Sequence, residues 1–349
     1  MCCNSDLKTG TMRPGDPEDY IRIITPVDWK GLDAKAPAWE DFMQTIFDGD
    51  SDLVDYMHRL LGLSLVGEVR EHIMPVLWGR GRNGKSTMFN SLKHVLGDHA
   101  SPIPAETLLK QNTSKSGASH TADLFILKDR RLVWTSEISD GKYFDAATVK
   151  RLTGGDDLSA RRCHGIDFEV IKQSHTLMML TNFRPHVHDA SDYALFQRLH
   201  LIPFGLSFVP DPKEPHERKA DVGLENKLRD EASGILAWLV RGCMRYLEAG
   251  GLKPPQVILD ATKEYQETED VFGHFLEDCI EKALGKREDA GAVYQAYQKW
   301  CHTNGHFALS GTKFHKKMQE KFTRRKSGVY IYLDVVLVAT GDVVAGDDF

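Results

Sequence analysis

The chain has no long apolar run and no excess of positive charge. None of its apolar stretches reaches the about 20 residues that a membrane-spanning helix needs, and the first ten residues lack the basic-then-apolar order of a signal peptide. The formal net charge of −6 gives no general attraction to nucleic acids, so any such binding must depend on local basic clusters. We therefore expect a cytoplasmic protein that makes no membrane contact.

Cysteine is also scarce. The six cysteines are Cys2, Cys3, Cys163, Cys243, Cys279 and Cys301. They form no C-x-x-C pair and are too sparse for a disulfide framework, which favours a reducing compartment. Cys301, His302 and His306 could form a zinc site, but ordinary helix-end residues are the favoured interpretation.

The length and composition suit a globular protein with one sizeable domain and one or two small ones. The chain has 349 residues, of which 41% are apolar and 27% are charged. Its first 35 residues are turn-rich and show no periodic element. We predict five segments: a tether at 1–35, a helical subdomain at 36–70, an α/β core at 71–210, a helical segment with a linker at 211–255, and a C-terminal domain at 256–349.

The most informative stretch is MPVLWGRGRNGKSTMFNSL, residues 74–92. An apolar strand, Met74 to Trp78, runs into a glycine-rich turn and then into a helix over 86–95. The spacing G-x-x-x-x-G-K-S is that of the phosphate-binding loop, in which Lys85 meets the β- and γ-phosphates and the Ser86 hydroxyl holds Mg²⁺. The loop residues expected at the nucleotide are Gly79, Arg80, Gly81, Arg82, Asn83, Gly84, Lys85, Ser86 and Thr87. A chance glycine-rich turn is the less favoured alternative, so we predict a nucleoside triphosphate site.

Three polar residues after this loop are candidates for its chemistry. Glu137 follows the apolar run RLVWT, where a nucleotide hydrolase places the carboxylate that orients Mg²⁺ or polarises water. Asn182 follows the apolar run LMML and can reach a γ-phosphate or the attacking water. Arg198 suits the charge on a transferring phosphoryl group and is often supplied by a neighbouring subunit. The alternatives are an exposed strand-end Glu, a strand-end Asn cap and a solvated surface Arg.

A basic hairpin is predicted between these candidates. The stretch LSARRCHGIDFEVIK alternates apolar and polar residues on both sides of Gly165. Its arms carry Arg161, Arg162, His164 and Lys172. Together these side chains make an electrostatic contact for phosphates.

The C-terminal segment predicts a second basic surface. Helices are expected at about 256–284 and 290–303 and from Ser310 to about Phe322, followed by a strand pair in VYIYLDVVLV. Three helices followed by a hairpin is the winged-helix arrangement. The outer face of its last helix is expected to carry Lys313, Lys316, Lys317 and Lys321. Such a face favours nucleic-acid binding, and a merely solvated lysine-rich face is the alternative.

Taken together, these stretches resemble the helicase part of phage and plasmid primase-helicases, an AAA+-type, superfamily 3 ATPase core that poxvirus relatives share. The resemblance covers about residues 15 to 335 and rests on GRGRNGKST, the run ending in SE, the LTGGD segment, the run ending in TN, and FQRLHLIPF. It implies that Gly84, Lys85 and Ser86 are the Walker A motif, Glu137 the Walker B acid, Asn182 the sensor and Arg198 a finger acting across a ring interface. The hairpin would line a central channel and track single-stranded DNA.

Two departures from this family matter. Ser136 stands where many superfamily 3 proteins have a first Walker B acid, which leaves Glu137 to hold Mg²⁺ with Ser86. The primase half that often lies upstream is absent from the sequence, which has neither paired catalytic aspartates nor a zinc ribbon. We therefore expect a truncated or short-form member that makes no primers.

The function expected from the resemblance is an ATP- and Mg²⁺-dependent DNA helicase. It would form a homo-oligomeric ring, expected to be a hexamer, and move 3′ to 5′ on single-stranded or forked DNA beside a separate primase or polymerase. Its expected setting is a bacterial cytoplasm, with the gene carried by a phage, prophage or plasmid. The alternatives are an ATPase that melts or loads origin DNA without processive unwinding, and a nucleotide-gated DNA-binding module.

Overall fold

The fold is described from a computed structural model that covers residues 3–110, 124–135, 138–160, 168–187 and 189–338. The chain divides into two compact units, which we describe separately. The large unit consists of Met1–His186 and Asp192–Tyr265, and the small unit of Val187–Ser191 and Gln266–Phe349. The finer division into five segments stays a prediction.

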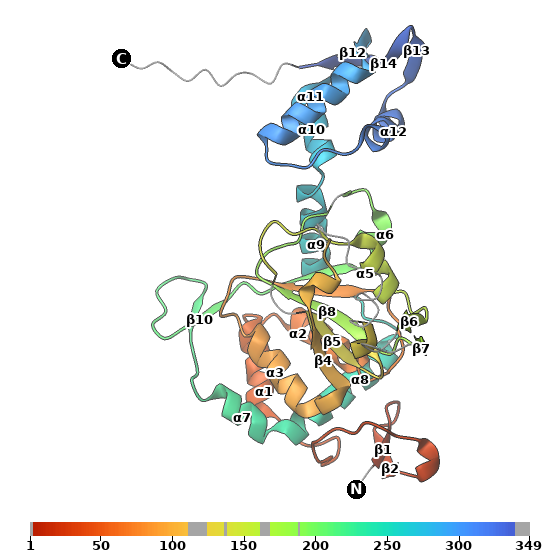
Figure 1. The fold of residues 1–349 in the computed structure, drawn as a ribbon. Helices are drawn as coiled ribbons and strands as arrows, with labels where there is room; N and C mark the ends of the chain where they lie inside the picture. The colour runs from red at the N-terminus through yellow and green to blue at the C-terminus, as the bar shows by residue number, and fades with distance from the viewer. Residues whose placement is uncertain (1–2, 111–123, 136–137, 161–167, 188, 339–349) are drawn as a thin grey trace. The chain divides into compact units, whose positions relative to one another are not determined.

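A parallel sheet forms the centre of the large unit (Figure 1). In the part of the chain that the structure describes, its five strands are β4 (Ala100–Ile103), β5 (Leu132–Thr135), β8 (Thr176–Thr181), β3 (Met74–Trp78) and β9 (Leu199–Pro203), in that order. Every neighbouring pair is parallel. The carboxyl ends of β3, β5 and β8 therefore lie at one edge, and polar residues that follow these strands are brought together. The α/β class expected from the sequence is confirmed as a mixed α/β fold with a parallel central sheet.

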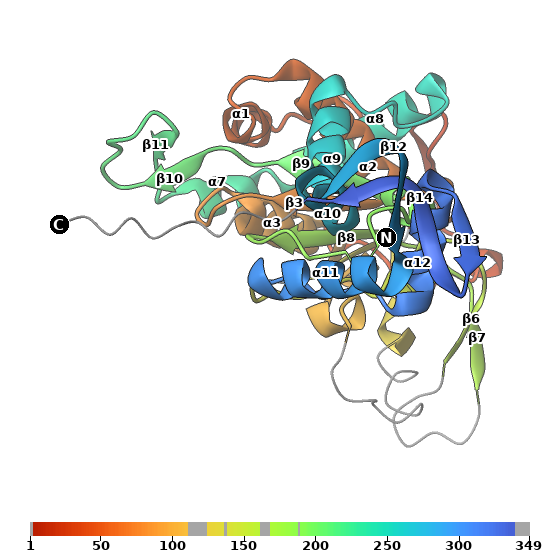
Figure 2. The same ribbon diagram turned by 90° about the horizontal axis from the view of Figure 1, so that it is seen from above.

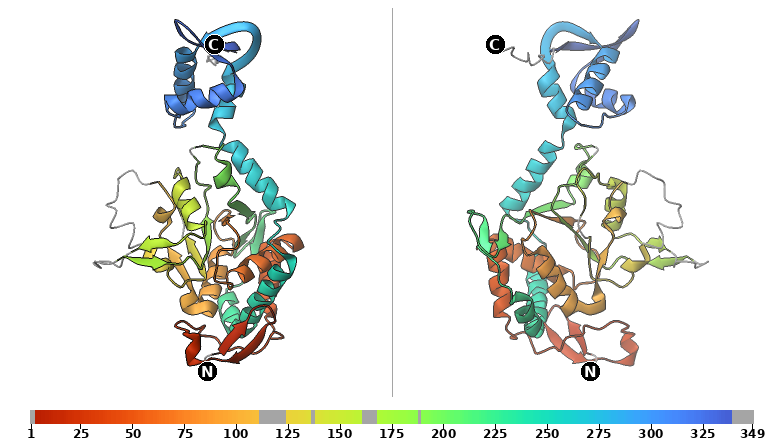
Figure 3. Two further views of the ribbon diagram at one scale, coloured as in Figure 1. Left: turned by 90° about the vertical axis from the view of Figure 1, so that its right-hand side faces the viewer. Right: turned by 60° about the vertical axis from the view of Figure 1, so that its left-hand side comes forward.

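Helices cover one face of this sheet. They are α1 (Pro37–Ile46), α2 (Ser51–Leu63), α3 (Lys85–Leu96), α7 (Leu224–Asp230) and α8 (Ala232–Ala249). Their buried side chains join those of alternate strand residues, such as Leu77 and Leu180, in one core. Figure 3 shows the orange-red α1 and α2 gathered with the teal α8 on one side of the sheet.

Helices α2 and α8 touch backbone to backbone. A Cβ atom added at Gly62 would lie 2.1 Å from the Cys243 backbone nitrogen, and one added at Gly242 would lie 2.2 Å from the His58 carbonyl oxygen. Both distances are far below van der Waals contact, so only glycine allows this approach.

Smaller elements complete the large unit. They are β1 (Cys3–Asp6), β2 (Thr11–Pro14), four short 3₁₀ turns within the described ranges (Pro17–Asp19, Gly97–His99, Ala105–Thr107 and Phe125–Leu127), α5 (Ala146–Leu152), β6 (Leu158–Ala160), β7 (Glu169–Ile171), α6 (Tyr193–Phe196), β10 (Ser207–Val209), β11 (Glu217–Lys219) and α9 (Gln256–Thr268), which runs into the small unit. The prediction of no element in residues 1–35 is wrong, because β1 and β2 form an antiparallel pair. Residues 100–103 pair with β5 as the edge strand of the parallel sheet.

The small unit combines helices with an antiparallel sheet. Its elements are α10 (Val271–Cys279), β12 (Ile280–Asp289), α11 (Ala290–Thr303), α12 (Gly311–Lys321), β13 (Arg324–Ser327) and β14 (Val329–Leu337). The strands pair in the order β12-β14-β13 around a core that includes the buried Phe275, Tyr297 and Phe314. The single helix predicted over 256–284 is wrong. It is interrupted where Asp270 caps α10 by accepting a hydrogen bond from Gly273 N, and residues 280–282 pair with β14 as a strand.

Two further expectations can be compared with the described residues. None of their helices is both long and apolar enough to cross a membrane. Within the described ranges, no group of three His, Cys, Asp or Glu side chains could hold a metal ion, so the alternative zinc site is not formed there. Cys301 is instead a buried free thiol, and the His306 ring stacks on Trp300 with the ring centroids 5.7 Å apart.

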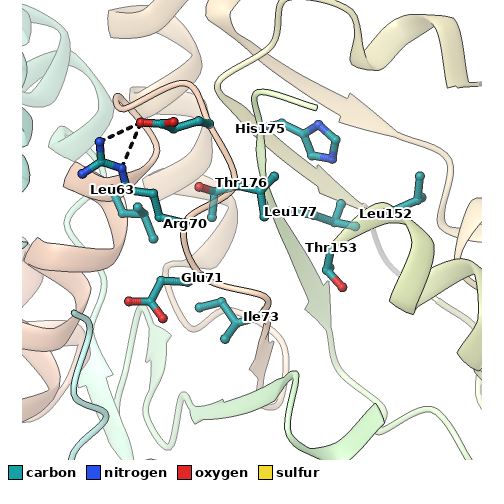
Figure 4. A pocket seen from close by; sticks show the side chains of 11 residues that line it. Leu63, Arg70, Glu71, Ile73, Leu152, Thr153, His175, Thr176 and Leu177 are labelled. Atoms are coloured by element: carbon teal, nitrogen blue, oxygen red, sulfur yellow. Dashed lines mark hydrogen bonds and ion pairs between the residues drawn. The ribbon is translucent and has the colours of Figure 1, made fainter. Parts of the chain in front are cut away.

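Buried histidines make the large unit sensitive to acid. Burial lowers the pKa of His58, of His175 and of His200, each to about 4. Figure 4 shows His175 beside Thr176 and Leu177, at the start of β8, with Arg70 across from them. The cavity that these residues line measures only about 10 Å³, which is about the room for one water, so His175 has a structural role here.

We expect the free energy of unfolding to fall as the pH drops from about 6.5 towards 4. Between these pH values a histidine in the unfolded chain binds a proton, whereas the buried histidine in the folded chain does not. Protonation therefore favours the unfolded state, and the stability present above pH 6.5 is lost. His175→Leu should remove up to about 3 kcal/mol of this pH dependence, since its pKa is lowered from 6.5 to about 4. Urea unfolding at pH 7.5, 6 and 5 measures it, with the exposed His94→Gln as the control. An unchanged pH dependence in His175→Leu would contradict the assignment.

Candidate functional site

The glycine-rich turn after β3 has the backbone of an anion-binding loop. Gly84 has φ 86° and caps the start of α3, and Arg82 also has a positive φ, 62°. Such left-handed residues turn backbone N–H groups into a concave nest, and the helix N-terminus adds its positive dipole end. A side chain at Gly84 would be strained and would lie 2.8 Å from Ile46 Cγ2. The backbone at Gly84 therefore requires glycine, and phosphate binding by this loop stays a prediction.

Lys85 is buried at the mouth of this turn, with 5% of its surface exposed. Its Nζ donates to Gly79 O at 2.9 Å, to Thr181 O at 3.0 Å and to Asn182 Oδ1 at 3.3 Å. The fold therefore brings Lys85 and Asn182, two of the predicted site residues, within hydrogen-bond distance of each other.

Two buried polar atoms nearby have an unused hydrogen-bonding capacity. Asn83 is 4% exposed, and its Nδ2 has no hydrogen-bond partner among the described residues. The same holds for Oγ1 of Thr135, which is fully buried at the end of β5. Unsatisfied buried donors are rare and often mark a site for a ligand or an ion. A phosphate oxygen would satisfy the Asn83 amide, so the residues present suit a bound triphosphate.

Ser86 is exposed at the second position of α3, and its role at Mg²⁺ stays a prediction. Gly79 is buried, whereas Arg80, Gly81 and Arg82 are exposed and Thr87 is half-buried. Glu137, the predicted partner of Ser86 at Mg²⁺, lies outside the described residues.

Arg198 lies at the opposite edge of the sheet from this loop. Its carbonyl oxygen accepts a hydrogen bond from Met74 N, at the first residue of β3, at 2.6 Å, whereas the loop follows the last residue of that strand, Trp78. At about 3.3 Å per residue, a strand of this length separates the two ends by about 16 Å. The Arg198 guanidinium donates to Ala194 O, and its Nε is buried without a partner among the described residues. Within one chain, Arg198 and Lys85 are therefore not brought together.

The predicted basic hairpin is present at its base. Strands β6 and β7 pair antiparallel, with Leu158 opposite Ile171. Lys172 follows β7 directly and lines a cavity of about 550 Å³ together with Lys128 and Arg131. Arg161, Arg162 and His164 lie outside the described residues, so their position at the tip stays a prediction.

A strand that the sequence pattern did not predict, β10, packs against the loop. β10 follows β9, and its Phe208 N donates to Arg82 O at 2.7 Å, while Ser207 Oγ donates to Gly81 O at 3.3 Å. Phe204 O lies 2.2 Å from the position that a Cβ atom would take at Gly79. The alternating apolar residues of IPFGLSFV were the available signal, but three-residue strands are too short for periodicity to identify.

Family models match three parts of the chain. A model described as D5 N terminal like matches residues 5–48, and one described as Poxvirus D5 protein-like matches residues 267–333. A model of a family of unknown function matches residues 77–198, which include the loop, β5, β8 and Arg198.

Curated relatives align over most of the chain. A protein named as a putative helicase in Acanthamoeba polyphaga mimivirus is 27% identical over 317 residues, 86% of this chain. A second, from Frog virus 3, is 27% identical over 84% of the chain, and a protein named as a putative primase in African swine fever virus is 21% identical over 70% of it. Together, the matched models and relatives support a primase-helicase family member.

The chain spans only part of the length of those relatives. It covers 32% of the length of the mimivirus protein and 30% of that of the Frog virus 3 protein. A solved structure, the NrS-1 C terminal region, has the same fold, with a TM-score of 0.53 at 13% identity over 87% of this chain and 77% of the other.

The small unit corrects one surface prediction. Lys313, Lys316 and Lys321 are exposed, as expected for the outer face of α12. Lys317 is not, because its side chain is only 11% exposed and its Nζ pairs with Asp189 Oδ1 at 2.7 Å. Burial would raise the pKa of Asp189, but the hydrogen bonds from Lys317 and Ser191 outweigh it and hold that pKa below its usual range. Lys317 therefore fixes the 187–191 segment within the small unit, and its predicted exposure is wrong.

Proposed function

We propose that this chain is an ATP-driven DNA helicase of the superfamily 3 type, working as a homo-oligomeric ring, a hexamer, on single-stranded or forked DNA. The observation that carries the proposal is the buried Lys85 at the mouth of a left-handed glycine turn, hydrogen-bonded to Asn182 at the carboxyl edge of the parallel sheet. The names of the curated viral relatives support a replication function. The 3′ to 5′ direction, the partner primase or polymerase and the bacterial cytoplasm stay predictions.

In this proposal, the chain's own residues bind and orient the triphosphate. Lys85 and the loop N–H groups hold the phosphate oxygens, Asn182 contacts the γ-phosphate and Glu137 orients the attacking water. Ser86 and Glu137 would hold Mg²⁺, which supplies charge neutralisation at the phosphates. Because Arg198 lies about 16 Å from the loop of its own chain, its role requires the loop of a neighbouring copy.

The small unit, in the same proposal, is a winged-helix-like DNA-binding domain. Its order of helix, strand, two helices and two strands suits that arrangement, and α12 would be its recognition helix. Lys313, Lys316 and Lys321 would contact phosphates from α12. The hairpin residues Arg161, Arg162, His164 and Lys172 would contact the strand in the channel.

Two substitutions on α12 can distinguish the loss of a DNA phosphate contact from the loss of folding stability. We expect Lys316→Ala to weaken DNA binding and to lower the slope of log K against log salt by about 1, because one phosphate contact is lost. Lys317→Ala should leave that slope unchanged and lower the melting temperature, because Lys317 pairs with Asp189 inside the unit. Fluorescence anisotropy between 50 and 200 mM salt measures the first effect, and calorimetry the second. Equal salt slopes for Lys316→Ala and the wild type would contradict the surface assignment.

The test of the proposed function combines three measurements on the same samples. ATP hydrolysis is measured with and without single-stranded DNA, oligomer mass by light scattering, and strand displacement on a forked duplex. DNA-stimulated hydrolysis with strand displacement supports a helicase. Hydrolysis without displacement supports an ATPase that melts or loads origin DNA, and nucleotide binding without turnover supports a nucleotide-gated DNA-binding module.

A further inference from the structure

A cavity of about 520 Å³ adjoins the predicted phosphate-binding loop in the large unit. From the loop side, Arg82, Gly84 and Thr87 line it. Its other walls come from α1, from β10 and the segment after β11, and from the start of α7. Figures 1 and 2 show the β10–β11 pair standing out from the central sheet. The volume is typical of a small-molecule site and is large enough for a purine nucleoside.

The strand order determines which part of a triphosphate this cavity can take. β3 lies between β8 and β9, so Asn182 and the Lys85 ammonium are on the β8 side of the loop, and β10, which follows β9, is on the other side. If the γ-phosphate lies at Lys85 and Asn182, the nucleoside must leave the loop on the side of Thr87 and β10. The cavity is on that side.

We propose that the nucleoside of the bound triphosphate occupies this cavity, with its purine ring against Phe208 and its exocyclic amino group facing Asp41 and Glu225. The inference rests on the proposed nucleotide-binding function and deepens it by assigning the base-binding pocket.

Phe208 is positioned for this contact by the loop itself. Its backbone nitrogen donates to Arg82 O at 2.7 Å, and β10 is held further by its parallel pairing with β11. Its ring is half-buried and lines the cavity. An aromatic face fixed relative to the phosphate site can stack on a base at a set distance from the triphosphate.

The three carboxylates that line the cavity differ in whether they already accept hydrogen bonds from the protein. Asp221 already accepts from Gly223 N at 2.9 Å and from Lys227 Nζ at 2.6 Å. Neither the Asp41 nor the Glu225 carboxylate has a hydrogen bond or an ion pair with another described residue. Such acceptors favour the amino group of adenine and disfavour hypoxanthine, whose oxygen at the same position repels a carboxylate.

The test uses three probes with the full chain in excess Mg²⁺: ATP, ITP and inorganic tripolyphosphate, which has no nucleoside. Isothermal titration calorimetry gives the affinity of each for the wild type, Phe208→Ala and the double variant Asp41→Asn with Glu225→Gln. Val209→Ala is the matched control, because Val209 is also half-buried on β10 but does not line the cavity.

We expect the wild type to bind ATP about tenfold or more tightly than ITP and tripolyphosphate. Phe208→Ala should remove about tenfold of the ATP affinity and leave that of tripolyphosphate unchanged. The double variant should close the gap between ATP and ITP. Val209→Ala should retain all three affinities.

The inference is overturned if ATP, ITP and tripolyphosphate bind the wild type within twofold of one another, which needs no variant, or if Phe208→Ala binds ATP like the wild type. Tripolyphosphate binding reports the folding of each variant, and Phe208→Leu replaces Phe208→Ala if the latter is unfolded. Failure of the proposed function gives a different result, because tripolyphosphate would then not bind, or would bind Lys85→Ala equally well.

Discussion

Replacing Lys85 with alanine is expected to reduce ATP hydrolysis by at least about 10²-fold. The substitution removes the buried ammonium group that would stabilise the negative charge on the transferring phosphoryl group. The same change should weaken the binding of ATP and of tripolyphosphate. Lys85 is only 5% exposed, and its ammonium donates to Gly79 O, Thr181 O and Asn182 Oδ1, which fix its position at the loop. Steady-state hydrolysis and calorimetry measure the two effects.

The loss in Lys85→Ala has to be separated from misfolding. The substitution leaves Gly79 O and Thr181 O without the lysine donor, so some loss of stability is expected. Lys85→Arg keeps the charge but has a different geometry, and should fold better while remaining nearly inactive. Lys30→Ala, at an exposed lysine of the large unit, is the control. Full hydrolysis by folded Lys85→Ala would overturn the nucleotide site.

Replacing Arg198 with alanine is expected to abolish hydrolysis while leaving the affinity for ATP close to that of the wild type. Arg198 lies beside Met74, the first residue of β3, about 16 Å from the loop that follows the last residue of this strand. It therefore cannot hold the phosphates in the same copy. A finger supplied by a neighbouring copy typically contributes about 10³-fold or more to turnover.

Mixing two inactive variants tests whether Arg198 acts between copies. In a mixed ring of Lys85→Ala and Arg198→Ala chains, some interfaces combine an intact Lys85 with an intact Arg198 of the neighbour. Hydrolysis should then return to a fraction of the wild-type rate, although neither variant is active alone. Arg229→Ala, at an exposed arginine of α7, is the control. No recovery in mixtures that form rings would contradict the trans-acting finger.

The elements at the predicted nucleotide site follow from local sequence. The strand over 74–78 is found at the predicted bounds, and the helix predicted over 86–95 is α3, Lys85–Leu96. β8 contains the predicted Leu177–Leu180 run. Each of these elements can be recognised from neighbouring residues alone, by an apolar run, a glycine at a left-handed position or a helix start. The same locality is why the sequence alone predicts Gly84, Lys85 and Asn182 as site residues.

Other elements have no such local signal. Residues 100–103 contain Pro102, which disfavours a strand, yet they pair with β5 as an edge strand, where a proline is tolerated. The apolar residues within 256–284 fit a helix, but residues 280–284 lie in the strand β12, which pairs with the distant β14. Lys317 has the helical position of an exposed residue, and the contact that covers it comes from Asp189, far away in the chain.

The sequence by itself determined the local chemistry of this protein: the strand, glycine turn and helix around Lys85, and the polar residues that follow the neighbouring strands. The tertiary structure alone decided which of them meet. The order β4-β5-β8-β3-β9 brings Asn182 to the Lys85 ammonium, leaves Arg198 at the far edge, and sets β10 against the loop beside a cavity. The physical reason is that backbone conformation depends on adjacent residues, whereas strand neighbours are chosen by burial and pairing between segments that lie far apart in the chain.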